Sequence, residues 1–86
     1  MNDMNNTYQI KEDGRNGTVT VTKKGLLRSI KKFRKNDEQF IPWSSVDYIK
    51  HDKRLRTDII SVQTPSGKFE WKTDAADHIS ATFQNL

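Results

Sequence analysis

The two histidines are the side chains whose type and surroundings could support acid–base chemistry. His78 follows Asp74 by four residues and Asp77 by one, and His51 stands beside Asp52. A carboxylate that orients an imidazole belongs to many catalytic sites, but an Asp and a His four residues apart on a helix usually make only a weak surface contact. No serine or threonine stands in a nucleophile motif. We therefore expect no enzymatic activity and no catalytic residue.

The sequence also offers no recognisable site for a metal ion or an organic cofactor. The chain has no cysteine, and His51 with Asp52 would supply only two adjacent ligands, fewer than a zinc site needs. The four glycines fall in expected turns, and none belongs to a phosphate-binding loop. We expect the protein to work without a cofactor.

Basic residues are concentrated in two segments of a chain whose formal net charge is +4. Residues 23–35 contain seven Lys and Arg and no acid, and residues 50–56 contain four against one acid. If both segments lie on one side of the fold, they would attract phosphate-rich partners, and salt would weaken that attraction. The candidate residues for contact with a partner or an anion are Lys23, Lys24, Arg28, Lys31, Lys32, Arg34, Lys35, Lys53, Arg54 and Arg56.

Three interpretations of the basic segments remain open at this point. The first treats the cations as the solvated face of a docked segment. The second is binding of nucleic acid or an anionic membrane, but the chain lacks a recognition-helix pattern and an exposed aromatic pair of the RNA-binding kind. Membrane binding through one such segment would also be weak without a second anchor. The third is protein contact, because apolar residues interspersed with arginine are typical of interface anchors.

Turn and strand patterns in the first quarter of the chain predict a β-hairpin. Residues 1–6 are polar and are predicted to form a disordered N-terminus, so the single domain covers 7–86. Alternation at 7–11 and a β-branched run at 18–23 are typical of strands. Asp-Gly and Asn-Gly pairs between them tolerate the positive φ of tight turns.

The segment that follows predicts a short helix. Leu26, Leu27, Ile30 and Phe33 are spaced as on one helical face, which places the basic residues on the opposite side. We therefore predict a helix over 26–34. An isolated helix of this length is marginal in water, so tertiary contacts must hold it, and a twisted strand is the alternative.

The remainder predicts further strands and a closing helix. Pro42 marks a strand end or an edge. Thr73 or Asp74 is a suitable N-cap for a helix over 74–85. The predicted strands cover 39–41, 46–50, 58–64 and 68–72, with a basic loop at 51–57. The apolar stripe of the helix comprises Ala76, Ile79, Phe83 and Leu86.

The two tryptophans are predicted to lie in the core. Trp71 alternates with Phe69 on one face of a strand, and Trp43 follows the proline at a corner. We expect both indoles to pack between the sheet and the closing helix, and each indole N–H to find an acceptor.

Three short motifs carry a resemblance to a known family. A strand ends in Lys23-Lys24-Gly25, the signature IPWSSV occupies 41–46, and a later strand ends in Thr64-Pro65-Ser66-Gly67. With this order of elements, residues 18–64 resemble bacterial pleckstrin-homology-like domains. The most similar group is often found beside a short C-terminal oligomerisation module and has no assigned activity. The basic segment is heavier here than the group's pattern requires.

The resemblance implies a bent, nearly orthogonal antiparallel sheet, a partly open barrel that a C-terminal helix closes. The chain looks short for the usual seven strands and helix, which predicts that one strand is missing or abbreviated. The fold itself does not fix the function, because it serves as a platform for lipids, peptides and self-assembly.

We therefore expect an α+β, mainly β domain that acts by binding. The leading prediction is a non-catalytic protein-interaction module that docks to or modulates a larger protein, or self-associates through an exposed strand edge. The alternative is an electrostatic binder of nucleic acid or anionic lipid through residues 23–35. Size and resemblance suggest a bacterial or phage source. The chain has no apolar run of membrane-spanning length and no signal-peptide pattern, so a cytoplasmic location is expected.

Overall fold

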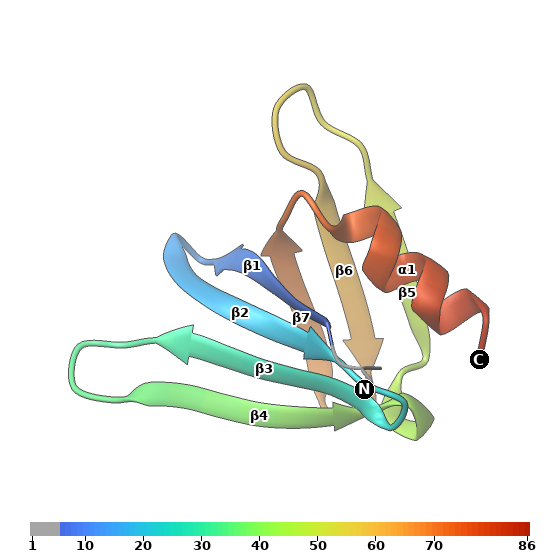
Figure 1. The fold of residues 1–86 in the computed structure, drawn as a ribbon, viewed down its shortest axis with the longest axis horizontal. Helices are drawn as coiled ribbons and strands as arrows, with labels where there is room; N and C mark the ends of the chain where they lie inside the picture. The colour runs from blue at the N-terminus through green and yellow to red at the C-terminus, as the bar shows by residue number, and fades with distance from the viewer. Residues whose placement is uncertain (1–5) are drawn as a thin grey trace.

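The computed structural model describes residues 6–86, which form one antiparallel sheet and a C-terminal helix (Figure 1). The mainly β prediction is confirmed, but the prediction of a missing strand is wrong, because all seven are present. In chain order the elements are β1 (Asn6–Glu12), β2 (Arg15–Val21), β3 (Gly25–Lys31), β4 (Asn36–Pro42), the 3-10 turn η1 (Trp43–Ser45), β5 (Tyr48–Asp52), β6 (Ile59–Thr64), β7 (Gly67–Lys72) and α1 (Ala76–Gln84). Asn6 already belongs to β1, and the rest of the predicted disordered terminus lies outside the described residues.

The strands follow the order β4-β3-β2-β1-β7-β6-β5, so β4 and β5 are the two edges and the sheet does not close into a barrel. Strands β1 and β7 cross near their C-terminal ends, where Lys11 lies directly opposite Lys72. Within residues 6–86 this is the single registered pair between those strands, whereas β1 and β2 are registered along their whole length. The sheet therefore bends at the β1–β7 junction.

The first hairpin forms, but its turn is shorter than predicted, because Asn16 and Gly17 belong to β2 and pair with β1. Asp13 and Gly14 have φ angles of 51° and 80° between β1 and β2. Two successive residues with positive φ are typical of the type I′ turn, whose twist matches that of the strands it joins.

The predicted helix over 26–34 is wrong and the alternative, a strand, is confirmed, because residues 25–31 form strand β3 between β2 and β4. Leu26, Arg28 and Ile30 alternate toward the interior, and Leu27 points away from it. Because the central inward residue is an arginine, the sequence does not show the alternation of apolar and polar residues that is typical of a strand. Glycine is needed where the strand begins, since a Cβ on Gly25 would lie 2.2 Å from the carbonyl oxygen of Ile41.

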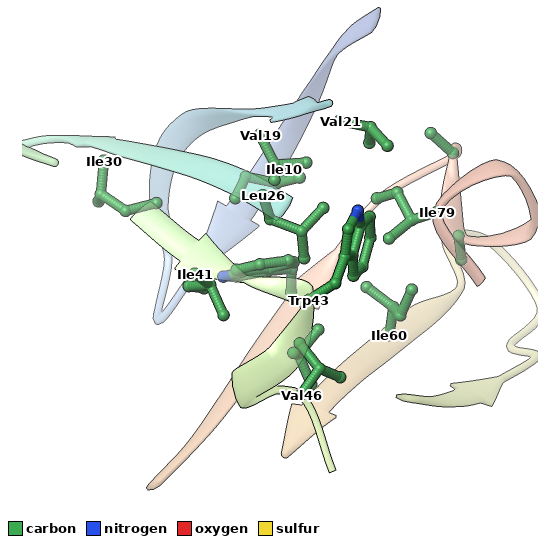
Figure 2. Close-up of a cluster of buried hydrophobic side chains, with 14 residues drawn as sticks. Ile10, Val19, Val21, Leu26, Ile30, Ile41, Trp43, Val46, Ile60 and Ile79 are labelled. Carbon is green, nitrogen blue, oxygen red and sulfur yellow. The ribbon is translucent and has the colours of Figure 1, made fainter. Parts of the chain in front are cut away.

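The core fills the concave side of the bent sheet, and α1 packs against β5 and β6 (Figure 2). Both tryptophans are buried, as predicted. The Trp43 indole N–H donates to the Thr22 carbonyl at 3.0 Å, and its ring lies 5.7 Å from that of Phe83 in the helix. The largest fully buried side chains among the described residues are Val19, Leu26, Ile30, Ile60, Val62, Trp71 and Ile79.

The helix is slightly shorter than the predicted 74–85. Neither predicted N-cap residue occupies the cap position, which is Ala75. The Thr73 hydroxyl instead accepts the Ala75 N–H at 3.1 Å and donates to the Gln9 carbonyl at 2.9 Å, which ties the start of the helix to β1. Leu86 lies beyond the last helical turn and is exposed, so it does not extend the buried stripe. No helix in residues 6–86 is long and apolar enough to cross a membrane.

Candidate interaction surface

The outer face of the β3–β4 hairpin carries an exposed apolar pair. Leu27 of β3 lies directly opposite Phe40 of β4, and their side chains are 42% and 46% exposed. The pair stands on this face because its neighbours Leu26 and Ile41, also directly opposite each other, point into the core. Adjacent apolar side chains on a solvent-facing surface can form part of a contact site.

This apolar pair lies beside a free strand edge. Strand β4 pairs with β3 on one side and ends the sheet on the other, so part of its backbone has no partner within the described chain. The other edge strand, β5, is contacted by the helix. Figure 1 shows β4 at the border of the sheet remote from α1. An uncovered edge can accept another strand.

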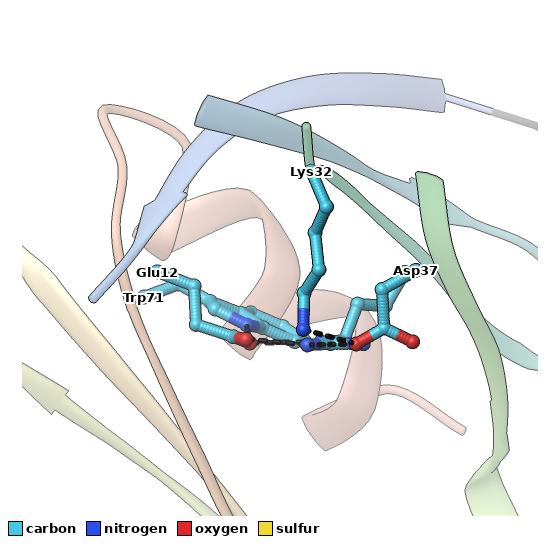
Figure 3. Close-up of polar contacts among 5 residues, drawn as sticks. Glu12, Lys32, Asp37 and Trp71 are labelled. Carbon is cyan, nitrogen blue, oxygen red and sulfur yellow. Dashed lines mark hydrogen bonds and ion pairs between the residues drawn. The ribbon is translucent and has the colours of Figure 1, made fainter. Parts of the chain in front are cut away.

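Arg28, one of the predicted contact residues, is part of the interior. Its side chain is 6% exposed and forms an ion pair with Glu12 of β1, in which Nε donates to Oε1 at 2.8 Å and Nη2 to Oε2 (Figure 3). The Trp71 indole N–H donates to Glu12 Oε1 at 2.8 Å, and the Phe69 ring centre lies 5.4 Å from the guanidinium carbon. Arg28 therefore joins β1, β3 and β7, and it is not available to a partner.

The electrostatics of this cluster agree with its geometry. Hydrogen bonding to Arg28 is the main reason that the pKa of Glu12 lies below its ordinary value, although burial acts in the opposite direction. The same bond to Glu12 raises the pKa of Arg28. Both groups therefore stay ionised, as a buried charge pair must be to compensate its desolvation.

The other predicted cations do not form one surface, because they occupy three separate parts of the fold. Figure 1 shows the β2–β3 turn, the β3–β4 loop and the β5–β6 loop at different ends of the molecule. The first holds Lys23 and Lys24. The second holds Lys32, Arg34 and Lys35, with Lys31 at the end of β3. The third holds Lys53, Arg54 and Arg56.

Two of these basic loops also present an exposed apolar side chain. Phe33 is 92% exposed between Lys32 and Arg34, and Leu55 is fully exposed between Arg54 and Arg56. The Arg34 guanidinium lies 5.7 Å from the Phe33 ring centre. The predicted helical face is thus divided, with Leu26 and Ile30 in the core and Leu27 and Phe33 exposed.

The histidines have contacts that are structural in kind. The two ring nitrogens of His51 face Asp58 Oδ2 at 2.7 Å and Asp77 Oδ1 at 3.1 Å, so this side chain joins β5, the β5–β6 loop and α1. The His78 ring stacks on Tyr8 with 5.8 Å between ring centres, and no ion pair joins it to Asp74 in residues 6–86. No group of three metal-binding side chains gathers in that part of the chain.

The hydrogen bond from His51 is the main cause that lowers the pKa of the Asp58 carboxyl, with the Arg54 backbone N–H as the second. Asp58 Oδ1 accepts that N–H at 3.1 Å. One carboxylate thus holds the basic β5–β6 loop against strand β5.

No family model matches the chain, and no curated protein matches its sequence. The assignment of a contact surface therefore rests on the geometry of the Leu27–Phe40 pair and the edge of β4. The sequence did not single out Phe40 as part of this surface, although a strand with Ile41 inside must place Phe40 outside. It also did not indicate Glu12 as the interior partner of Arg28, because Glu12 lies outside the predicted strand over 7–11.

Proposed function

We propose that this domain is a non-catalytic protein-interaction module with a pleckstrin-homology-like architecture. Seven antiparallel strands, a bend that divides them into four and three, and a C-terminal helix on the concave side support that architecture. The observation that carries the proposed function is the exposed Leu27–Phe40 pair beside the free edge of β4. A strand added to this edge would gain backbone hydrogen bonds and cover the apolar pair.

The added strand comes from a second copy of the chain in an antiparallel arrangement. A two-fold axis at Phe40 would place the two Phe40 side chains opposite each other, flanked by both Leu27 side chains, because directly opposite residues share a face. Self-complementary contacts of this kind are what two-fold dimers use.

Asp37 precedes Phe40 in β4 but is already paired within its own copy, with Lys32 and with Arg28, each at 3.4 Å. The loop before it carries Lys32, Arg34 and Lys35, so this end of the hairpin is basic, as is the β2–β3 turn at the other end. The antiparallel register is therefore favoured by the apolar contacts of Leu27 and Phe40 and not by charge.

Sedimentation of the full chain over a wide range of concentrations tests this proposal. The wild type is expected to dimerise and Phe40→Lys to remain monomeric, because the lysine would place like charges opposite each other. Tyr48→Lys is the matched control, since Tyr48 is a 52% exposed aromatic residue on the other edge strand. A monomeric wild type, or a Tyr48→Lys variant that dissociates as readily as Phe40→Lys, would overturn self-association. Capture of a larger protein that depends on Phe40 would then assign this edge to a strand of that protein.

A second candidate function is binding to an anionic membrane surface, and it is favoured by the exposed Phe33 and Leu55 at the tips of two basic loops. One anchor with a few basic residues binds membranes weakly, but two anchors reinforce each other. Burying each side chain is worth roughly 1.5–3 kcal/mol, and each nearby cation adds about 1 kcal/mol at an anionic surface. Nucleic-acid binding through 23–35 has less support, because the segment's cations lie at opposite ends of β3 and its central arginine is buried.

A further inference from the structure

Four basic side chains line an open groove at the bend of the sheet. Lys11 comes from β1, Lys72 from β7, and Arg54 and Arg56 from the β5–β6 loop. The groove has a volume of about 610 Å³, and Asn16, Thr57 and Thr73 add polar groups to its lining. Neither lysine was a predicted contact residue, because they are distant from the basic segments in sequence.

Two of the four cations are placed unfavourably for the isolated protein. Lys11 and Lys72 are directly opposite on neighbouring antiparallel strands, so their side chains rise from the same face. Like charges at such positions destabilise a sheet. The pair also stands at the single registered position that joins β1 and β7 among the described residues. An anion between these lysines would remove the repulsion at the bend.

The neighbouring acids do not neutralise the groove. Asp74 is the one acid in its lining as described, which leaves a formal net charge of +3 from four cations and one carboxylate. Asp13 and Glu70 line an adjoining pocket that the two lysines also border, but no ion pair in residues 6–86 joins either acid to Lys11 or Lys72. Arg54 approaches Asp52 at 3.7 Å, a distance that leaves most of its donors free.

The loop that carries Arg54 and Arg56 is anchored to the rest of the fold. Asp58 accepts the Arg54 backbone N–H and is itself held by His51, so the loop is tied to β5. Arginine and lysine together are the residues that recognise phosphate, the former through paired donors and the latter as a point charge.

We propose that this groove binds a small soluble oligophosphate, such as inorganic triphosphate or the triphosphate of a nucleotide. The groove is large enough for a ligand of this size, and its linked phosphates would supply negative charge both to the lysine pair and to the two arginines. The site is separate from the β4 edge, so it does not depend on the proposed self-association.

Calorimetric titration of the full chain with inorganic triphosphate tests this site. Wild type is expected to bind, and Lys11→Gln with Lys72→Gln to bind about tenfold more weakly, since each exposed ion contact is worth up to about 1 kcal/mol. The matched control is Lys23→Gln with Lys24→Gln, which removes the same charge from a turn outside the groove. Loss of affinity in both double variants to the same extent would show that only net charge matters and would overturn the site.

Thermal unfolding gives a second measure of binding that does not depend on the heat of binding. Triphosphate should raise the midpoint of the wild type and of the control but not that of the Lys11→Gln, Lys72→Gln variant, because a ligand stabilises the state that binds it. Without ligand, the same variant should be at least as stable as wild type, since the lysine repulsion is gone. Absence of binding to triphosphate, or binding only to vesicles that carry a phosphorylated lipid, would refute the proposal.

Discussion

The Arg28 guanidinium donates two hydrogen bonds to the Glu12 carboxylate inside the bent sheet, from Nε to Oε1 at 2.8 Å and from Nη2 to Oε2. Strand β2 and two turns separate these residues in the chain, yet their side chains join β1 to β3 across β2. The central charge of the most basic segment thus stabilises the fold, and contacts with partners are left to the cations in the loops.

Removing one member of this pair should destabilise the protein strongly. We expect Arg28→Met to lower the free energy of unfolding by about 3–5 kcal/mol, because the Glu12 carboxylate would remain buried with only the Trp71 N–H as a donor. Urea unfolding measures the change. Lys31→Met, a substitution at an exposed position of the same strand, should stay within about 0.5 kcal/mol of wild type. Equal effects at the two positions would contradict the structural role of Arg28.

The same pair predicts how stability changes with pH. The pKa of Glu12 in the folded protein lies below its ordinary value of 4.5, chiefly because Arg28 bonds to the ionised form. Its contribution is therefore complete above about pH 4.5 and is lost as the pH falls through the folded pKa. Urea unfolding at a series of acidic pH values should give a shallower pH dependence for Glu12→Gln than for wild type.

Glu70→Gln is the control for this pH experiment. It removes a carboxylate from the exposed face of β7 and leaves Arg28 and Glu12 in place. A pH dependence that becomes shallower in Glu70→Gln, but not in Glu12→Gln, would disprove the assignment.

The β5–β6 loop should loosen when its carboxylate anchor is removed. In Asp58→Ala the Arg54 N–H loses its acceptor and His51 loses one of its two partners. We expect faster hydrogen exchange at the Arg54 amide and weaker triphosphate binding, because Arg54 and Arg56 would no longer be held at the groove. Asp52→Ala is the control, since Asp52 contacts the Arg54 side chain and not its backbone. Unchanged exchange in Asp58→Ala would show that the loop is held by other contacts.

Local patterns were sufficient to predict most of the fold. The Asp-Gly turn, the alternation of Phe69 with Trp71, and the stripe of Ala76 and Ile79 each concern neighbours in the chain, and each led to the right element. Strand β3 was predicted only as the alternative to a helix, because its inward positions include Arg28. A charge is expected inside only when a partner is known, and its partner, Glu12, lies 16 residues away.

The candidate surfaces were less predictable, because they are assembled by pairing across the sheet. Leu27 meets Phe40 through the β3–β4 register, and Lys11 meets Lys72 through a crossing of the first and last strands. Neither juxtaposition follows from spacing along the chain. Conversely, Lys24 and Lys32 look close in sequence, but strand β3 keeps them at opposite ends.

The exposed loop tips give the final prediction, which concerns anionic vesicles. If the membrane candidate is right, Phe33→Ser and Leu55→Ser should each weaken binding to vesicles rich in phosphatidylserine. Each substitution removes an insertion worth roughly 1.5–3 kcal/mol, which corresponds to a loss of about tenfold or more. The vesicle affinity of the double variant should fall by the product of the two factors, because the tips lie on separate loops and do not touch. Vesicle co-sedimentation at low salt measures the effect.

Phe40→Ser is the matched control, since it removes an exposed aromatic side chain from the sheet without altering either loop tip. It should impair dimerisation and leave vesicle binding by the monomer intact. Changing Lys31, Lys32, Arg34 and Lys35 to Glu should abolish vesicle binding through repulsion while the fold persists, because the acidic variant would face a negative surface. Wild-type protein that fails to bind the vesicles at low salt would eliminate the membrane candidate, and the Leu27–Phe40 edge would remain as the contact surface.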